Sequence, residues 1–120
     1  MPSKAFTGNG KAIRASREFK TKLPCFKILM QYYNFNHNFV HLPSSFGRIL
    51  KELPDYIRLQ NSDGREWPVK VNKRLKHKCN RFTLGNGWAA FQKENNLKKG
   101  DVCAMELVSK NIWKVSVFRD

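Results

Sequence analysis

Short apolar runs alternate with turn-forming residues from Pro24 to the end of the chain, a pattern typical of β-strands. The side chains of a strand point to opposite faces in turn, so a half-buried strand shows apolar residues at every second position. The strands predicted on this basis cover residues 26–31, 38–42, 56–60, 65–71, 81–84, 102–107 and 112–118. We therefore expect a mostly β domain with about seven short strands.

One predicted turn is sharply defined and joins the strands at 56–60 and 65–71. Its Asp63–Gly64 pair supplies the positive backbone angles that a tight hairpin turn requires. In the strand that follows, three apolar side chains alternate onto one face, which leaves Pro68, Lys70 and Asn72 on the other. Because proline cannot donate to a ladder, Pro68 indicates an edge strand or a bulge.

Two short helices are predicted among these strands. The first opens at Pro43–Ser45, with proline at its start and serine near the cap, and it ends before Pro54. Its residues Phe46, Ile49 and Leu50 fall on one face. The second, at residues 88–94, directs Trp88, Phe91 and Leu97 toward the core. Strands and helices in this order predict a β barrel whose ends are closed by helices.

The N-terminal residues 1–21 differ in composition from the rest of the chain. They are rich in Gly, Ser, Ala and Thr, and their cations outnumber the single acid, Glu18. This predicts a flexible basic arm at residues 1–21, followed by one folded domain at residues 22–120.

The formal net charge of +14 is the most informative global property of the chain. Self-repulsion of this size opposes compactness, so we expect an anionic partner, either nucleic acid or a membrane surface. No apolar run approaches the roughly 20 residues that span a bilayer, and the N-terminus lacks a secretory signal. We therefore expect a reducing compartment and no membrane partner.

Catalysis and metal binding find little support in the sequence. The nine acids are scattered, and there is neither a Gly-rich phosphate loop nor a nucleophile elbow. Cys25, Cys79 and Cys103 form no CxxC pair, and with the histidines they match no zinc-ligand spacing, so mostly buried thiols are expected. We predict no enzyme activity, no cofactor, no metal and no small-molecule substrate.

The stretch KVNKRLKHKCNR at residues 70–81 holds six cationic side chains and no carboxylate. It is predicted as a basic connection between a strand and the short strand at 81–84. A solvated connector is the alternative, and a nuclear-localisation signal at Lys73–Lys78 is compatible with nucleic-acid binding. The missing acids, the outward Lys70 and Asn72, and the interleaved asparagines favour nucleic acid, because Arg and Lys suit phosphates while Arg and Asn can pair with base edges.

A second candidate is the polar and aromatic link from Gln31 to Asn38. It is either an ordinary loop with tyrosines packed on the barrel or a polar arm that reaches bases and phosphates. His41 alternates with Val40 and Leu42, so we expect an outward-facing strand residue there.

The order of several motifs resembles the plant B3-type DNA-binding domain. The matching segments are Phe26–Leu29, Val40–Phe46, Leu59–Gly64, Arg65–Val71, Leu84–Phe91, Asn95, Leu97, Gly100–Asp101 and Val115–Arg119. The resemblance implies a seven-stranded open pseudobarrel with two short helices, which binds duplex DNA in the major groove. It also implies two binding arms, at about residues 27–41 and 70–81. The Lys- and Arg-rich second arm is similar to the divergent reproductive-meristem and vernalization branch of the family.

From these observations we expect a nuclear module of a plant transcription regulator that binds double-stranded DNA, with strong phosphate contribution and modest sequence preference. Further domains of a longer chain are compatible with the resemblance. The residues that we expect to contact DNA are Lys27, Gln31, Asn34, Asn36, His37, Lys70, Asn72, Lys73, Arg74, Lys76, Lys78 and Arg81. One alternative is a β barrel that binds RNA or single strands by stacking bases on Tyr32, Tyr33 and Phe35. Another is a protein-interaction module with incidental charge.

Overall fold

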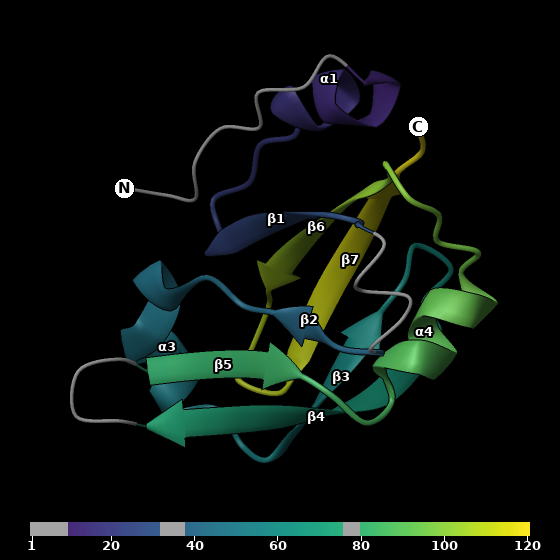
Figure 1. The fold of residues 1–120 in the computed structure, drawn as a ribbon. Helices are drawn as coiled ribbons and strands as arrows, with labels where there is room; N and C mark the ends of the chain where they lie inside the picture. The colour runs from purple at the N-terminus through teal and green to yellow at the C-terminus, as the bar shows by residue number, and fades with distance from the viewer. Residues whose placement is uncertain (1–9, 32–37, 76–79) are drawn as a thin grey trace.

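Seven strands form one curled, open sheet in the computed structural model, which describes residues 10–31, 38–75 and 80–120 (Figure 1). The strands are β1 (Cys25–Leu29), β2 (Val40–His41), β3 (Tyr56–Gln60), β4 (Glu66–Leu75), β5 (Asn80–Leu84), β6 (Val102–Leu107) and β7 (Ile112–Phe118). Their order is β1-β6-β7-β3-β4-β5-β2, and β3 and β7 are the parallel pair among antiparallel neighbours. The predicted seven-stranded open pseudobarrel is confirmed.

Two predicted helical segments lie at opposite ends of the sheet (Figure 1). The first consists of a 3-10 turn, η1 (Ser44–Phe46), that continues into α3 (Gly47–Lys51). The second is α4 (Trp88–Glu94), as predicted. The first segment begins after Pro43 without a side-chain cap, so the expected serine cap is wrong.

The core lies inside the curl of the sheet and is rich in aromatic rings. Its largest fully buried side chains include Trp88, Trp113, Phe26, Phe82 and Phe91. The Phe91 ring meets Trp67 edge-on, with 5.2 Å between centroids, which fixes α4 against β4. At this contact Gly87 has a φ of +101°, and an added Cβ would lie 2.1 Å from the Pro68 carbonyl oxygen. Glycine is therefore required where the chain enters α4.

The β3–β4 hairpin forms where it was predicted, but its turn is built differently. Gly64 has a φ of +83°, whereas Asp63 is not among the described non-glycine residues with positive φ. The Asn61 side-chain oxygen instead accepts hydrogen bonds from the backbone N–H groups of Asp63 and Arg65, at 3.1 and 3.0 Å. One positive-φ residue is therefore sufficient, because an Asx turn supplies the rest of the reversal.

Pro68 belongs to an interior strand of the sheet, but it lies in a part of that strand with one partner only, so the predicted edge character holds locally. β4 lies between β3 and β5, and the edges of the sheet are β1 and β2. The first half of β4, residues 66–70, pairs with β3, and the second half, residues 71–75, pairs with β5. Pro68 pairs with Arg58 in the half that has no second partner strand, so proline is tolerated in an interior strand.

Part of the N-terminal segment is an ordered helix, α1 (Lys11–Arg17), which lies over β6 and β7 (Figure 1). Its buried Ala12 and Ile13 pack with Val102, and Leu29 and Phe118 flank this small cluster. The expectation of a flexible arm is therefore wrong for residues 11–17. The helix is a short one, and its two core contacts were too few to give a periodic signal in the sequence.

Candidate nucleic-acid interface

The basic stretch at residues 70–81 is mainly a β-hairpin, and not the loop that was predicted. β4 continues to Leu75, four residues beyond the predicted end, and β5 begins at Asn80. The apolar alternation stops at Val71 because the inward position after it holds Lys73, and Leu75 is 59% exposed. Backbone pairing with β5 thus extends the strand where its side chains no longer build the core.

The hairpin presents one polar and basic surface to solvent. Val69, Val71, Phe82 and Leu84 are buried, so the residues that alternate with them face outward. We define the outer face of the hairpin as Lys70, Asn72 and Arg74 of β4 together with Arg81 and Thr83 of β5. Asn72 pairs across the ladder with Thr83, which in turn pairs with His41 of β2, so three polar side chains form one row.

Two arginines on this face lie directly opposite each other, Arg74 on β4 and Arg81 on β5. Like charges at facing positions destabilise a sheet. The sequence from Glu66 to Glu94 contains no other carboxylate and seven Lys and Arg residues, so it offers no local acid to offset the pair. An unfavourable charge pair that is exposed and uncompensated is the arrangement that an anionic ligand would relieve.

Neighbouring residues on β3 continue the surface. Tyr56 is 53% exposed and pairs with Lys70, whose ammonium group lies 5.7 Å from the centre of the tyrosine ring. At the far end of the same strands, Glu66 accepts hydrogen bonds from Arg58 and Gln60, each at 3.3 Å. Glu66 is thus engaged by two side chains of β3, at the end of β4 that lies away from Arg74.

Two lysines that the sequence placed in the DNA-contacting set bind backbone carbonyl groups. Lys73 points to the inner side of β4 and donates to the carbonyl oxygens of Lys51 and Leu53 at the C-terminal end of α3, the first at 2.8 Å. Lys27 on β1 donates to the Ser16 carbonyl at the end of α1. Both charges sit where a helix dipole favours a cation, away from the outer face of the hairpin.

The remaining predicted residues fall into two groups. Gln31 is exposed just after Met30, in the segment that follows β1. Asn34, Asn36, His37, Lys76 and Lys78 lie outside the described residues. The structure therefore brings Lys70, Asn72, Arg74 and Arg81 together, and the meeting of the two arms stays a prediction.

Sequence reasoning missed several members of this surface. Thr83 and Tyr56 were read only as parts of strands, and His41 was noted as outward without a neighbour. The signal that identifies them is the register of β2, β5, β4 and β3, which sequence alternation does not provide.

Other chemistry is sparse in the described part of the chain. Burial raises the pKa of the Cys103 thiol to about 12, and burial followed by the nearby Glu106 raises that of Cys25. Neither thiol is poised as a nucleophile at neutral pH. Residues 10–31, 38–75 and 80–120 contain no group of three or more His, Cys, Asp or Glu side chains arranged for a metal. In the same ranges no helix has the length and apolar character to cross a bilayer.

Known proteins match most of this chain in sequence. The profile of the B3 DNA binding domain matches residues 25–120. The chain is 33% identical over 113 residues to the B3 domain-containing transcription factor VRN1 of Arabidopsis thaliana, covering 91% of the chain and 32% of that protein. It is 34% identical over 110 residues to the B3 domain-containing protein Os11g0197600 of Oryza sativa subsp. japonica, covering 90% of the chain and 27% of that protein. The chain thus spans about a third or less of the length of these relatives.

A solved structure shares the fold. The Arabidopsis FUS3–DNA complex superposes with a TM-score of 0.61 at 18% identity, covering 78% of this chain and 95% of that one. At this identity the likeness concerns the curled seven-stranded sheet and its helices.

Proposed function

Because the chain belongs to the B3 DNA-binding domain family, we propose that it binds double-stranded DNA through the outer face of the β4–β5 hairpin. The observation that carries the proposal is the facing pair Arg74 and Arg81 beside Lys70, in a stretch of sequence that has no carboxylate between Glu66 and Glu94. The relatives that are B3 transcription factors support a role as a nuclear module of a transcription regulator, one that binds without catalysis.

The dimensions of the hairpin suit the major groove of duplex DNA. That groove is about 12 Å wide and admits a two-stranded β-ribbon. Lys70 and Arg74 are four residues apart on β4, which corresponds to about 13 Å along the strand. Cations at this spacing can contact the phosphates that border the groove, while the row of Asn72, Thr83 and His41 faces the base edges between them.

The composition of the face predicts modest sequence preference. Arginine and lysine contacts to phosphate position a protein without reading sequence. Asn72 is the side chain best suited to a bidentate contact with adenine. We therefore expect affinity to come mainly from Lys70, Arg74 and Arg81, together with Lys76 and Lys78, which follow β4 in the sequence. A smaller, sequence-specific part of the affinity should come from Asn72.

Salt dependence of duplex binding tests this proposal. If the five cations just named each neutralise one phosphate, the slope of log affinity against log salt concentration should be about −4.5. Replacement of both Arg74 and Arg81 by alanine should reduce the slope to about −2.7 and weaken binding to all duplexes alike. The matched control is Lys114→Ala, an exposed lysine on β7, which should keep the wild-type slope. A slope near zero, or equal loss in the control, would refute the outer face as the binding surface.

Binding to single strands is the competing outcome. Tyr56 is exposed beside Lys70 and could stack with an unpaired base. A competition between duplex DNA and a matched single strand separates the two. Preference for the single strand, lost in Tyr56→Ala, would replace the duplex model.

A further inference from the structure

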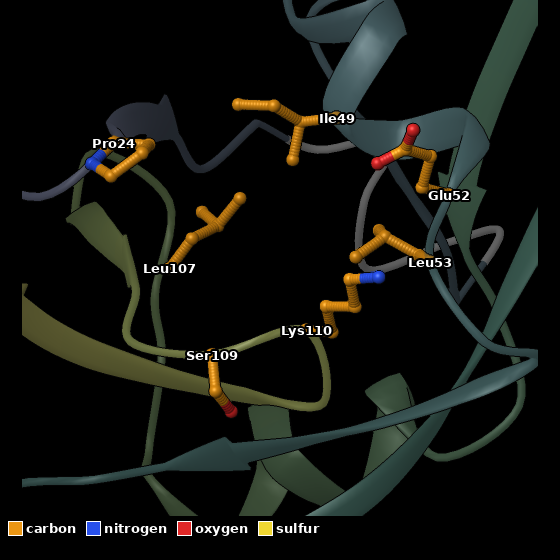
Figure 2. A pocket seen from close by; sticks show the side chains of 7 residues that line it. All are labelled: Pro24, Ile49, Glu52, Leu53, Leu107, Ser109 and Lys110. Carbon is orange, nitrogen blue, oxygen red and sulfur yellow. The ribbon is translucent and has the colours of Figure 1, made fainter.

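A pocket lies beside α3, and none of the residues that line it belongs to the outer face of the hairpin (Figure 2). It opens between α3, the residue that precedes β1, and the turn that joins β6 to β7. Its volume is about 250 Å³, and it is lined by Pro24, Ile49, Glu52, Leu53, Leu107, Ser109 and Lys110. Figure 2 shows the aliphatic side chains of Ile49, Leu53 and Leu107 around this space.

Exposed apolar side chains occur in the pocket lining and next to lining residues in the chain. Leu23 is 40% exposed, Ile49 36% and Val108 50%, and each of them lines the pocket or directly adjoins a lining residue in the chain. They are three of the five large hydrophobic side chains that are exposed in the described ranges. Ile49 was predicted on the buried face of its helix together with Leu50, yet only Leu50 is fully buried. Exposed apolar surface that is contiguous with a groove is typical of an interaction site.

The size of the pocket indicates the kind of occupant. Sites for small molecules and cofactors usually enclose about 300–1,000 Å³, so this pocket is below that range. An apolar cavity of about 150 Å³ is sufficient for a benzene ring. The pocket therefore has room for one large aliphatic or aromatic side chain, as an anchor residue of a protein partner would supply.

The charges near the pocket indicate the chemistry of that partner. Lys110 lines it, and Arg48 and Lys51 are exposed on α3, the short helix that contributes Ile49 and that Glu52 caps at its C-terminal end. The ammonium group of Lys73 adds a further positive charge at the end of that helix, next to the Leu53 carbonyl. Glu52 is the one acid among the lining residues. Together with the net charge of +14, this favours an acidic partner.

We propose that this pocket docks an acidic segment of a partner protein, which inserts one large apolar side chain between Ile49, Leu53 and Leu107. Carboxylates next to the inserted residue meet Lys110 and the cations of α3. None of the lining residues belongs to the outer face of the hairpin, so the segment and DNA bind to separate surfaces. Docking of this segment is a separate interaction from DNA binding and does not depend on it.

The test uses a short labelled peptide of Asp, Glu and Ser residues around one central Phe, and a twin peptide in which that Phe is Ser. The two carry equal charge, so general attraction to a basic protein affects both. Fluorescence anisotropy at near-physiological salt should show about tenfold tighter binding of the Phe peptide, as expected for burial of one aromatic side chain. Equal affinity for the two peptides would overturn the proposal.

Variants of exposed residues locate the binding without threatening the fold. Ile49→Ser combined with Val108→Ser should abolish the preference for the Phe peptide, whereas Leu75→Ser, at an exposed residue outside the pocket lining, should retain it. Lys110→Glu should weaken binding of the Phe peptide several-fold, and the matched Lys114→Glu should leave that binding unchanged. Retention of the preference in the Ile49 and Val108 double variant would refute the site.

A competing explanation is that the peptide binds the hairpin as a polyanion. In that case excess duplex DNA would displace it, and Arg74→Ala with Arg81→Ala would abolish its binding. Either result contradicts the pocket. Duplex binding is measured separately on the same variants, so failure of the pocket proposal is distinct from failure of the DNA-binding proposal.

Discussion

Replacement of Arg81 by glutamate should stabilise the folded domain and weaken its binding to DNA. Arg81 faces Arg74 across the β4–β5 ladder, and both side chains are exposed. The change converts a pair of like charges into a pair of opposite charges at the same positions. Facing pairs contribute roughly 0.2–1 kcal/mol each, so removal of the repulsion plus the new attraction should raise the free energy of unfolding by about 1 kcal/mol. For a domain of this size that corresponds to an increase in Tm of about 2–5 °C.

Thermal unfolding followed by circular dichroism measures this gain. Arg81→Gln removes the repulsion without adding attraction, so its Tm should lie between those of the wild type and Arg81→Glu. The differences should largely vanish at about 1 M salt, where the screening length is only about 3 Å. On the DNA side, loss of one phosphate contact should reduce the salt slope by about 0.9, and the new carboxylate should lower affinity further.

The two effects must have opposite signs for the reasoning to hold. If Arg81→Glu lowers the Tm at low salt, the arginine pair is not a repulsive contact in the free protein. If the variant is more stable yet binds duplex DNA as tightly as the wild type, the outer face of the hairpin is not the interface.

Three further predictions concern the scaffold. Gly87→Ala should lower the free energy of unfolding by about 1–3 kcal/mol or more, measured by urea titration. The cause is the φ of +101° at Gly87 and the Pro68 carbonyl oxygen, which lies where the new Cβ would be. An unchanged free energy of unfolding would mean that this turn can move to accept the side chain. Asp120→Ala should speed hydrogen exchange in α1 more than in the barrel, since the Asp120 carboxylate accepts from the Ala12 N–H at 3.4 Å; unchanged exchange would show that apolar packing alone holds the helix. Hydrogen bonds from Trp67 and then Arg65 lower the pKa of Glu94 in the folded protein. The Glu94 carboxylate therefore contributes to stability above its unfolded-state pKa, and this contribution is lost as the pH falls through its folded-state pKa. Glu94→Gln should therefore flatten stability against pH on the acid side of neutrality, measured by Trp fluorescence; an unchanged profile would exclude Glu94 as its source.

Most of the strands and α4 were predictable because their signals are local. The alternation of Trp67, Val69 and Val71 reflects burial of one face of β4, and that pattern exists in the sequence whatever the strand pairs with. Trp88 and Phe91, one helical turn apart, likewise direct one side of α4 to the core. Helix α1 gave no comparable signal, because a seven-residue helix is held by a few contacts to β6 and β7 and not by its own propensity.

The candidate interface was predictable as a composition but not as an arrangement. The sequence identified residues 70–81 as a stretch of uncompensated positive charge. It could not show that the side chains of Lys73 and Arg74 point in different directions. Only the pleat of β4 directs Lys73 inward to the carbonyl groups at the end of α3 and Arg74 outward to solvent.

By itself the sequence determined that this protein is a small, mostly β domain with a strong positive charge, because alternation and net charge are properties of the chain as written. Tertiary structure alone decided which cations face each other, which ones bind helix ends, and that Ile49 lies at the rim of a pocket and not in the core. Those outcomes depend on strand register and on the docking of α3. Both arise from contacts between residues far apart in the chain, which no local pattern encodes.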